Sequence, residues 1–302
     1  MNTKNWYQQS EYGAGTFRLD LVFFAYKIFG ARFIKFFVWM IAGIIGMTAK
    51  SARQFSKKYK QVLNTYQIAH NIKPSHFSPS QHIRKFTDSL VDKMIAMCDK
   101  KNCILFTPRH NSDWDEFQKL ISGNQGVFLI CSHIGNIEAL AAFQDNKNIK
   151  MHAFQQISQN SIFHKFISKH SVRKNTIIHP VEDMNIGTAS EMFDYLNNGD
   201  LVMMAGDRIS ATNPGKTIPV KILGQNCELP MGVFRFAKSM SHPIFATALL
   251  NTGHEKYELI VKKLDNQNAN NMAAEFAEFL EQNILIAPTQ WFNFYDFFQS
   301  DK

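Results

Sequence analysis

The chain lacks the short motifs that mark a metal centre, a nucleotide site or a serine nucleophile. Its four cysteines form no C-x-x-C pair and no histidine-rich cluster joins them, so we expect reduced, mostly buried thiols without a disulfide framework (Cys98, Cys103, Cys131 and Cys227). Gly215-Lys216-Thr217 resembles the end of a phosphate-binding loop, but the full motif requires glycine where this chain has Ser210. A G-x-S-x-G segment is also missing, so a serine hydrolase would lack its usual nucleophile. We expect no metal and no cofactor.

Basic charge is confined to the N-terminal part of the chain. Residues 1–60 contain ten basic and two acidic side chains, whereas the remaining residues contain 23 of each, so the net charge of +8 belongs to the N-terminal segment. Nucleic-acid-binding domains concentrate basic charge on the surface that meets phosphates. The even balance after residue 60 therefore argues against a nucleic-acid partner.

The same N-terminal segment contains an apolar run from Phe36 to Ala49, flanked by Lys35 and by Lys50, Arg53, Lys57 and Lys58. The run is shorter than the roughly 20 residues that a spanning helix needs, although snorkelling of Lys35 and Arg32 extends it back through Phe33 and keeps a single-pass helix possible. We favour a monotopic, shallowly inserted helix whose cations meet anionic lipid headgroups. The alternative is a buried core helix. The run starts too late for a cleaved signal peptide.

Buried strands and amphipathic helices alternate through the rest of the chain. Ser80 is expected to cap a helix that ends near Asp99. Strands are predicted at 127–131, 150–154, 176–179, 200–205, 218–222, 243–250 and 257–262, and helices at 137–143, 160–170, 187–196, 231–240 and 270–283. This alternation predicts an α/β fold with a mostly parallel central sheet flanked by helices.

A histidine and a carboxylate follow the strongest of these strands. His133 and Glu138 could not meet on one continuous helix, because residues five apart point about 140° away from each other. Gly135 and Asn136 favour a strand-loop-helix junction instead, where the imidazole can turn back toward the carboxylate. Glu138 would then hold the tautomer that leaves the other ring nitrogen of His133 free to accept a proton.

The spacing itself is weak evidence, since chance supplies about one His followed five residues later by Asp or Glu in such a chain. The second case here is His110 with Asp115, which follows a shorter apolar stretch and lacks glycine. We expect a solvated turn and a helix cap at His110. His133 is favoured because open α/β sheets bind ligands at the carboxyl ends of their strands.

Two further segments place polar residues at the ends of predicted elements. Asp207 and Arg208 follow the apolar strand Leu201–Ala205, and the Arg208 guanidinium suits a phosphate or a developing oxyanion, unless the pair only fixes the loop. Pro230 precedes a predicted helix whose N-terminus suits an anion, although a turn between two elements is the favoured interpretation. The aromatic tail 287–298 could cap the core, line an acyl pocket or rest at a bilayer interface.

Taken together, these segments resemble the bacterial acyltransferases of the lysophospholipid acyltransferase superfamily, in the branch of the lipid A lauroyl and myristoyl acyltransferases. The resemblance covers most of residues 100–302 and rests on Leu129–Glu138, Gly206–Arg208, Gly224–Gly232 and Pro288–Phe294. It implies the glycerolipid acyltransferase fold at residues 61–302, preceded in the chain by a basic, apolar membrane-associating helical segment at residues 1–60. It also implies a peripheral protein on the cytoplasmic face of the bacterial inner membrane.

The resemblance further implies a mechanism. His133 and Glu138 would form the H-x4-E dyad that deprotonates the acceptor, while Asp207, Arg208 and Pro230 would bind substrate. The acyl donor would be an acyl carrier protein thioester, and the acceptor a lipid or glycolipid hydroxyl that receives a fatty or polyene acyl group. Because no nucleophile motif is present, we expect direct transfer instead of a covalent enzyme intermediate. A thioesterase and a non-catalytic lipid-binding protein of the same fold are the alternatives.

Overall fold

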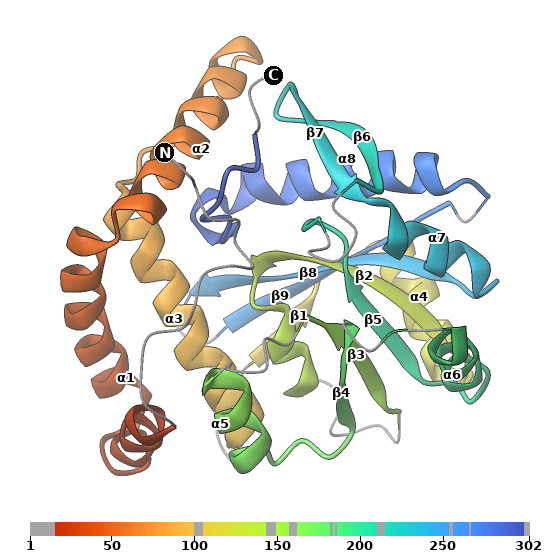
Figure 1. Cartoon of the computed structure of the whole chain (residues 1–302), viewed down its shortest axis with the longest axis horizontal. Helices are drawn as coiled ribbons and strands as arrows, with labels where there is room; N and C mark the ends of the chain where they lie inside the picture. Colours follow the sequence, from red (N-terminus) through yellow and green to blue (C-terminus); the bar gives the residue numbers. More distant parts are fainter. Residues whose placement is uncertain are drawn as a thin grey trace.

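The computed structural model describes residues 16–99, 105–142, 149–156, 162–181, 184, 186–209, 215–253, 256–265 and 267–298. A seven-stranded sheet forms its centre and has helices on both faces, and a separate two-stranded hairpin lies over one face of the sheet (Figure 1). This confirms the predicted α/β class with a mostly parallel sheet.

The sheet has the strand order β1-β9-β8-β2-β5-β3-β4. Its strands are β1 (Leu105–Pro108), β2 (Val127–Gly135), β3 (Met151–Gln155), β4 (Thr176–Pro180), β5 (Leu201–Ala205), β8 (Ile244–Gly253) and β9 (Lys256–Lys263). Each neighbouring pair is parallel except β8 with β9. β2 lies between β8 and β5, which places its carboxyl end in the middle of the sheet edge.

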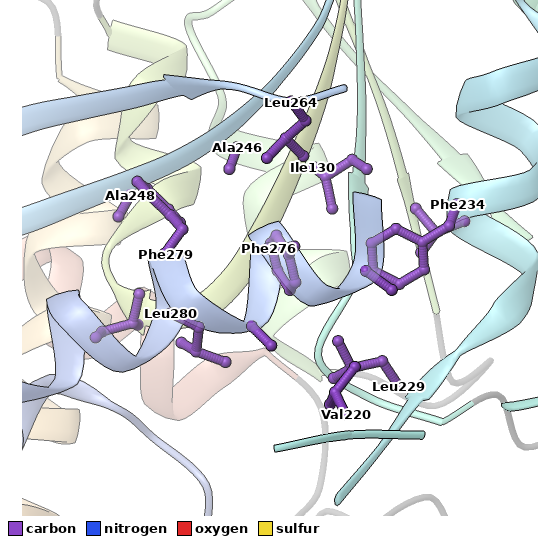
Figure 2. Close-up of a cluster of buried hydrophobic side chains, with 14 of the residues drawn as sticks. Ile130, Val220, Leu229, Phe234, Ala246, Ala248, Leu264, Phe276, Phe279 and Leu280 are labelled. Carbon is purple, nitrogen blue, oxygen red and sulfur yellow. The ribbon is translucent and has the colours of Figure 1, made fainter. Parts of the chain in front are cut away.

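Side chains of β2 alternate between two hydrophobic cores. Phe128 and Ile130 belong to the core under α8 (Ala269–Ile286), whereas Leu129 and Cys131 belong to the core on the opposite face. Figure 2 shows the first core, in which Ile130 and the α8 side chain Phe276 lie among residues of β8, α7 (Met231–Ser239) and the hairpin. Burial on both faces explains why the strand reads as a continuous apolar run.

The first core is covered by α6 (Ile186–Asn197), α7, α8 and the antiparallel hairpin of β6 (Thr217–Ile222) with β7 (Gln225–Pro230). The second core is covered by α3 (Pro79–Cys98), α4 (Ser112–Ser122) and α5 (Ile162–His170), together with the short 3-10 helix η2 (Ile137–Ala142). α2 (Lys50–Ala69) contributes Tyr59 and Leu63 to the first core, and η4 (Pro288–Gln290) follows α8.

The N-terminal helix α1 (Phe17–Thr48) lies on the outer side of α3, away from the sheet (Figure 1). Gly30 interrupts it with a φ of 80° and a ψ of 173°, which only glycine adopts readily. Lys35 pairs with Asp92 of α3 at 2.5 Å. Within the described residues, no helix is long and apolar enough to cross a membrane.

The contacts change the expected role of two N-terminal cations. Lys35 and Lys58 were expected among the charges that meet lipid headgroups, but Lys35 pairs with Asp92 and Lys58 pairs with Asp296 at 2.6 Å. Both ammonium groups therefore form ion pairs within the chain.

Several local expectations can be compared with the observed elements. The seven predicted strands are confirmed, although the strand predicted at 218–222 pairs only with β7 in the hairpin and not within the central sheet. β1 was not predicted. α3 is capped by Ser78, not by Ser80, because Ser78 and Gln81 form a reciprocal capping box around the first turn, which begins at Pro79.

The remaining expectations concern cysteines and domains. Cys98, Cys131 and Cys227 are buried free thiols as predicted, and Cys103 lies outside the described residues. The proposed division into residues 1–60 and 61–302 stays a prediction, and its boundary falls inside α2.

Candidate active site

The carboxyl end of β2 carries His133 on a bulge. Pairing between β2 and β8 shifts register between Cys131 and Gly135, so the strand bends where the histidine leaves it. Gly135 has a φ of 69°, and a Cβ at this position would lie 2.0 Å from the carbonyl oxygen of Leu249. Glycine is therefore required there, because only its backbone can approach β8 so closely.

His133 and Asp207 meet because β2 and β5 are adjacent parallel strands. Cys131 pairs with Ala205, so His133 and Asp207, two positions after this last pair, lie side by side. His133 Nδ1 lies 2.8 Å from Asp207 Oδ1, and the His133 backbone N–H donates to Oδ2 at 2.9 Å. Since an ionised carboxylate only accepts hydrogen bonds, Nδ1 carries the proton and Nε2 is left as the basic nitrogen.

Asp207 is fully buried, and it is held as a carboxylate by its neighbours. Burial raises its pKa, but the charges of His133 and Arg208 and the hydrogen bonds from His133 outweigh that effect and bring the pKa below its usual range. An ionised Asp207 stabilises a positive charge on His133. The pair can therefore accept a proton at Nε2 and return it.

Glu138 occupies a different position from the one expected. It lies in the first turn of η2, and its carboxylate forms an ion pair with Lys93 of α3. Although burial opposes ionisation, Lys93 and the charges of His133 and Arg208 lower the pKa of Glu138. The hydrogen-bond partner of His133 Nδ1 is therefore Asp207 and not Glu138 as expected, whereas the catalytic role of Glu138 stays a prediction.

The other predicted residues are distributed unequally around this centre. Arg208 follows Asp207 directly, and its Nη2 donates to the backbone oxygen of Phe292 at 3.1 Å. Pro230 ends β7 and precedes α7, and none of the contacts described for it joins it to His133. His110 is exposed at the start of α4, where Asn111 supplies the cap, so the expectation of a surface turn is confirmed.

Two neighbours of the site were missed from the sequence. Lys93 lies in the middle of α3, where its helical spacing gave no sign that its ammonium group reaches Glu138. Trp291 was noted as part of the aromatic tail and of the family resemblance but not as a site residue, yet its indole N–H lies 3.4 Å from Asp207 Oδ2. The one signal in the sequence was the tryptophan itself, because a buried indole N–H needs a hydrogen-bond acceptor.

The site has the components of an acid-base centre for acyl transfer and no cluster of metal ligands. Across the described ranges, no group of three or more His, Cys, Asp or Glu side chains could hold a metal ion. No curated protein matches the chain. The profile of the bacterial lipid A biosynthesis acyltransferases matches residues 77–300, a range that includes β2, β5, His133, Glu138 and Asp207. The chain therefore belongs to the bacterial lipid A biosynthesis acyltransferase family and is an acyltransferase.

Proposed function

We propose that the protein transfers a fatty or polyene acyl group from an acyl carrier protein thioester to a hydroxyl of a lipid or glycolipid acceptor. The observation that carries this proposal is the hydrogen bond between His133 Nδ1 and buried Asp207, which leaves His133 Nε2 as a base at the carboxyl edge of the sheet. The membership of the family supports the reaction class.

In the proposed reaction, His133 Nε2 takes the proton from the acceptor hydroxyl while the oxygen attacks the thioester carbonyl. The tetrahedral intermediate then collapses, the carbon-sulfur bond breaks, and the departing thiolate receives the proton from His133. The ester and the free carrier thiol are the products. No covalent bond to the protein is formed at any step.

The carboxylates have separate proposed roles. Asp207 fixes the tautomer of His133 and stabilises its imidazolium through direct hydrogen bonds. Glu138, kept ionised by Lys93, adds negative charge near His133 without holding its Nδ1. Arg208 lies beside Asp207 and supplies positive charge for a developing oxyanion or for an acceptor phosphate.

The test compares His133→Ala, Asp207→Asn, Glu138→Gln and a surface control, His110→Ala. Acyl carrier protein thioesters are incubated with a bacterial polar lipid extract, and mass spectrometry follows the appearance of lipids that gain one acyl group. We expect His133→Ala to abolish transfer and Asp207→Asn to lower kcat on the order of 10³-fold, because an amide cannot stabilise the imidazolium. Glu138→Gln should lose less than Asp207→Asn.

His110→Ala should retain wild-type turnover. Normal turnover of His133→Ala would refute the mechanism, and accumulation of free fatty acid without acylated lipid would identify a thioesterase. Unchanged thioester and lipid with the wild-type protein would favour a non-catalytic lipid-binding protein.

We also propose that α1 attaches the protein to the cytoplasmic face of the inner membrane. Its outward side exposes large apolar side chains, namely Phe17, Leu21, Phe24, Ile28, Phe29, Phe33, Phe36, Phe37, Trp39, Met40 and Ile41. Exposed Arg18 and Arg32 on the same helix add positive charge suited to anionic headgroups, whereas Lys27 pairs with Asp99 at 3.1 Å. An apolar helix face flanked by cations is typical of interfacial binding.

Sedimentation with phosphatidylglycerol-containing vesicles and with pure phosphatidylcholine vesicles tests this attachment. Wild-type protein should bind the anionic vesicles more tightly, and the double variant Phe24→Asp/Phe36→Asp should lose binding. Ile286→Asp is the matched control, because Ile286 is an exposed apolar residue of α8 on the other face of the sheet. Equal binding of the two variants would contradict the proposal.

A further inference from the structure

A short segment near the C-terminus crosses the edge of the sheet beside His133. We define this segment, Trp291–Tyr295, as the C-terminal strap. Trp291 forms a β-bridge with Ile134, and the Phe292 backbone N–H donates to the carbonyl oxygen of His133 at 2.9 Å. The strap is therefore attached to the main chain of the histidine itself.

The strap also reaches the residues on the neighbouring strand end. Arg208 Nη2 donates to the Phe292 carbonyl oxygen at 3.1 Å, and the Tyr295 hydroxyl donates to the Asp207 carbonyl oxygen at 3.2 Å. The indole N–H of Trp291 approaches Asp207 Oδ2 at 3.4 Å. Backbone and side-chain contacts of one five-residue segment thus involve His133, Asp207 and Arg208.

Trp291 is fully buried, and its ring is held by aromatic neighbours. The rings of Tyr59 and Phe297 meet it edge to face, with centroid distances of 5.3 and 4.8 Å. Because the indole cannot turn away without displacing these rings, its N–H keeps pointing at the carboxylate. This contact restricts the rotation of the Asp207 carboxylate about its side-chain bond.

His82 of α3 fixes the main chain of the strap from the other side. Its side chain is fully buried, and its Nε2 lies 2.9 Å from the carbonyl oxygen of Trp291. A carbonyl oxygen can only accept, so Nε2 carries the proton and Nδ1 accepts from the hydroxyl of Ser56 at 3.1 Å. Ser56 belongs to α2, which precedes the part of the chain matched by the family profile.

We infer that Trp291 is a positioning residue for the His133–Asp207 pair and that His82, supported by Ser56, holds Trp291 in the position this requires. The inference rests on the proposed function, since it concerns the same base. It assigns α2 and α3 a part in catalysis through a continuous series of hydrogen bonds, from Ser56 through His82 and Trp291 to Asp207.

The physical argument concerns how the negative charge of Asp207 is shared. Oδ1 accepts from His133 Nδ1, whereas Oδ2 accepts from the His133 backbone N–H and from the indole. If the indole N–H is removed and the geometry is kept, more of the charge is available to the imidazolium. If the carboxylate instead loses its orientation, the imidazolium is stabilised less. The first case moves the acid limb of the pH profile to higher pH, and the second moves it to lower pH.

The first experiment compares Trp291→Phe with Trp114→Phe in the full-length protein. Both variants replace a buried indole by a phenyl ring, but Trp114 lies in the core on the opposite face of the sheet and serves as the control. Turnover is measured with acyl carrier protein thioesters and polar lipid extract. For Trp291→Phe we expect a threefold to tenfold lower kcat, which is the effect of one weak hydrogen bond to a charged group, and a KM within twofold of wild type.

Because lost orientation of Asp207 stabilises the imidazolium less, the acid limb of kcat/KM should move to lower pH in Trp291→Phe and stay in place in Trp114→Phe. The charged groups around the pair, Glu138, Lys93 and Arg208, are left unchanged by both variants. A kcat within twofold of wild type, or an acid limb that stays or moves to higher pH, overturns the inference.

The second experiment needs no substrate and compares His82→Gln with His82→Leu. Gln retains a side-chain N–H that can reach the Trp291 carbonyl oxygen, whereas Leu removes it. The ¹⁵N chemical shifts of histidine report which ring nitrogen of His133 carries the proton. We expect the Nδ1–H form in wild type and His82→Gln and a mixture of tautomers in His82→Leu.

Identical His133 tautomers in His82→Gln and His82→Leu would overturn the role of His82, even if Trp291→Phe fails to fold. Failure of the proposed function is distinguished by His133→Ala. Full activity of His133→Ala refutes the proposed base, whereas inactive His133→Ala with normal Trp291→Phe refutes only the positioning role.

Discussion

His82 should make the stability of the protein depend on pH by an amount that follows from its burial. Burial lowers the pKa of its imidazole from 6.5 to about 4, and the hydrogen bond to the Trp291 carbonyl opposes this shift only in part. Between these two values the unfolded chain binds a proton that the folded protein does not bind, so stability is lost as pH falls from about 6.5 to about 4. The full shift corresponds to about 3 kcal/mol, of which about 2 kcal/mol is lost between pH 7 and pH 5.

Urea unfolding of wild type and His82→Gln at pH 7, 6 and 5 measures this contribution. Because glutamine does not titrate, the variant should lose about 2 kcal/mol less than wild type between pH 7 and pH 5. Tyr59→Phe is the control, since Tyr59 packs against His82 but the substitution removes only a hydrogen bond to the Pro288 carbonyl oxygen. Its pH dependence should equal that of wild type. If His82→Gln and wild type differ by less than about 0.5 kcal/mol over this range, His82 is not the buried neutral imidazole described.

Two further substitutions test the surroundings of the site. Gly135→Ala should destabilise the protein by about 2–4 kcal/mol in urea unfolding, because its Cβ would collide with the Leu249 carbonyl oxygen and its φ is positive. Gly232→Ala is the control and should be neutral or stabilising, because a Cβ at that position meets open space. A double-mutant cycle of Lys93→Met and Glu138→Gln in urea unfolding should give a coupling free energy of about 1 kcal/mol or less, because the Glu138 side chain is 38% exposed. A coupling free energy above about 3 kcal/mol would instead show that the ion pair is a major stabilising contact.

The sequence was sufficient for six of the seven strands of the central sheet, because their side chains repeat a simple pattern. Leu201–Ala205 and Val127–Cys131 are buried on both faces, so their apolar runs could be recognised without knowing their neighbours. β1 was missed because its side chains alternate between exposed and half-buried at the edge of the sheet, beside β9. Edge strands give a weaker apolar signal than central ones.

The cap of α3 was misplaced by two residues for a local reason. Ser78 and Ser80 are both suitable caps, and the choice depends on which serine meets a residue that can return the hydrogen bond. Gln81 lies three positions after Ser78 and completes the capping box there. Reading the serine together with the residue three positions later would have given the observed start.

The hydrogen-bond partner of His133 Nδ1 was expected to be Glu138, because sequence distance was the only measure of proximity available. In space, residues at the same offset after a paired position of two adjacent parallel strands lie close together, and this relation brings Asp207 to His133 across 74 positions. Both strand ends were recognised as polar and of interest. What was missing was the strand order, since β3 and β4 intervene in the chain between β2 and its neighbour β5. The nearest carboxylate in the sequence was then free to pair elsewhere, and Lys93 of α3 supplied its partner. For a histidine at the end of a parallel strand, the orienting acid is therefore better sought at equal offsets beyond the other buried strands than within the next turn.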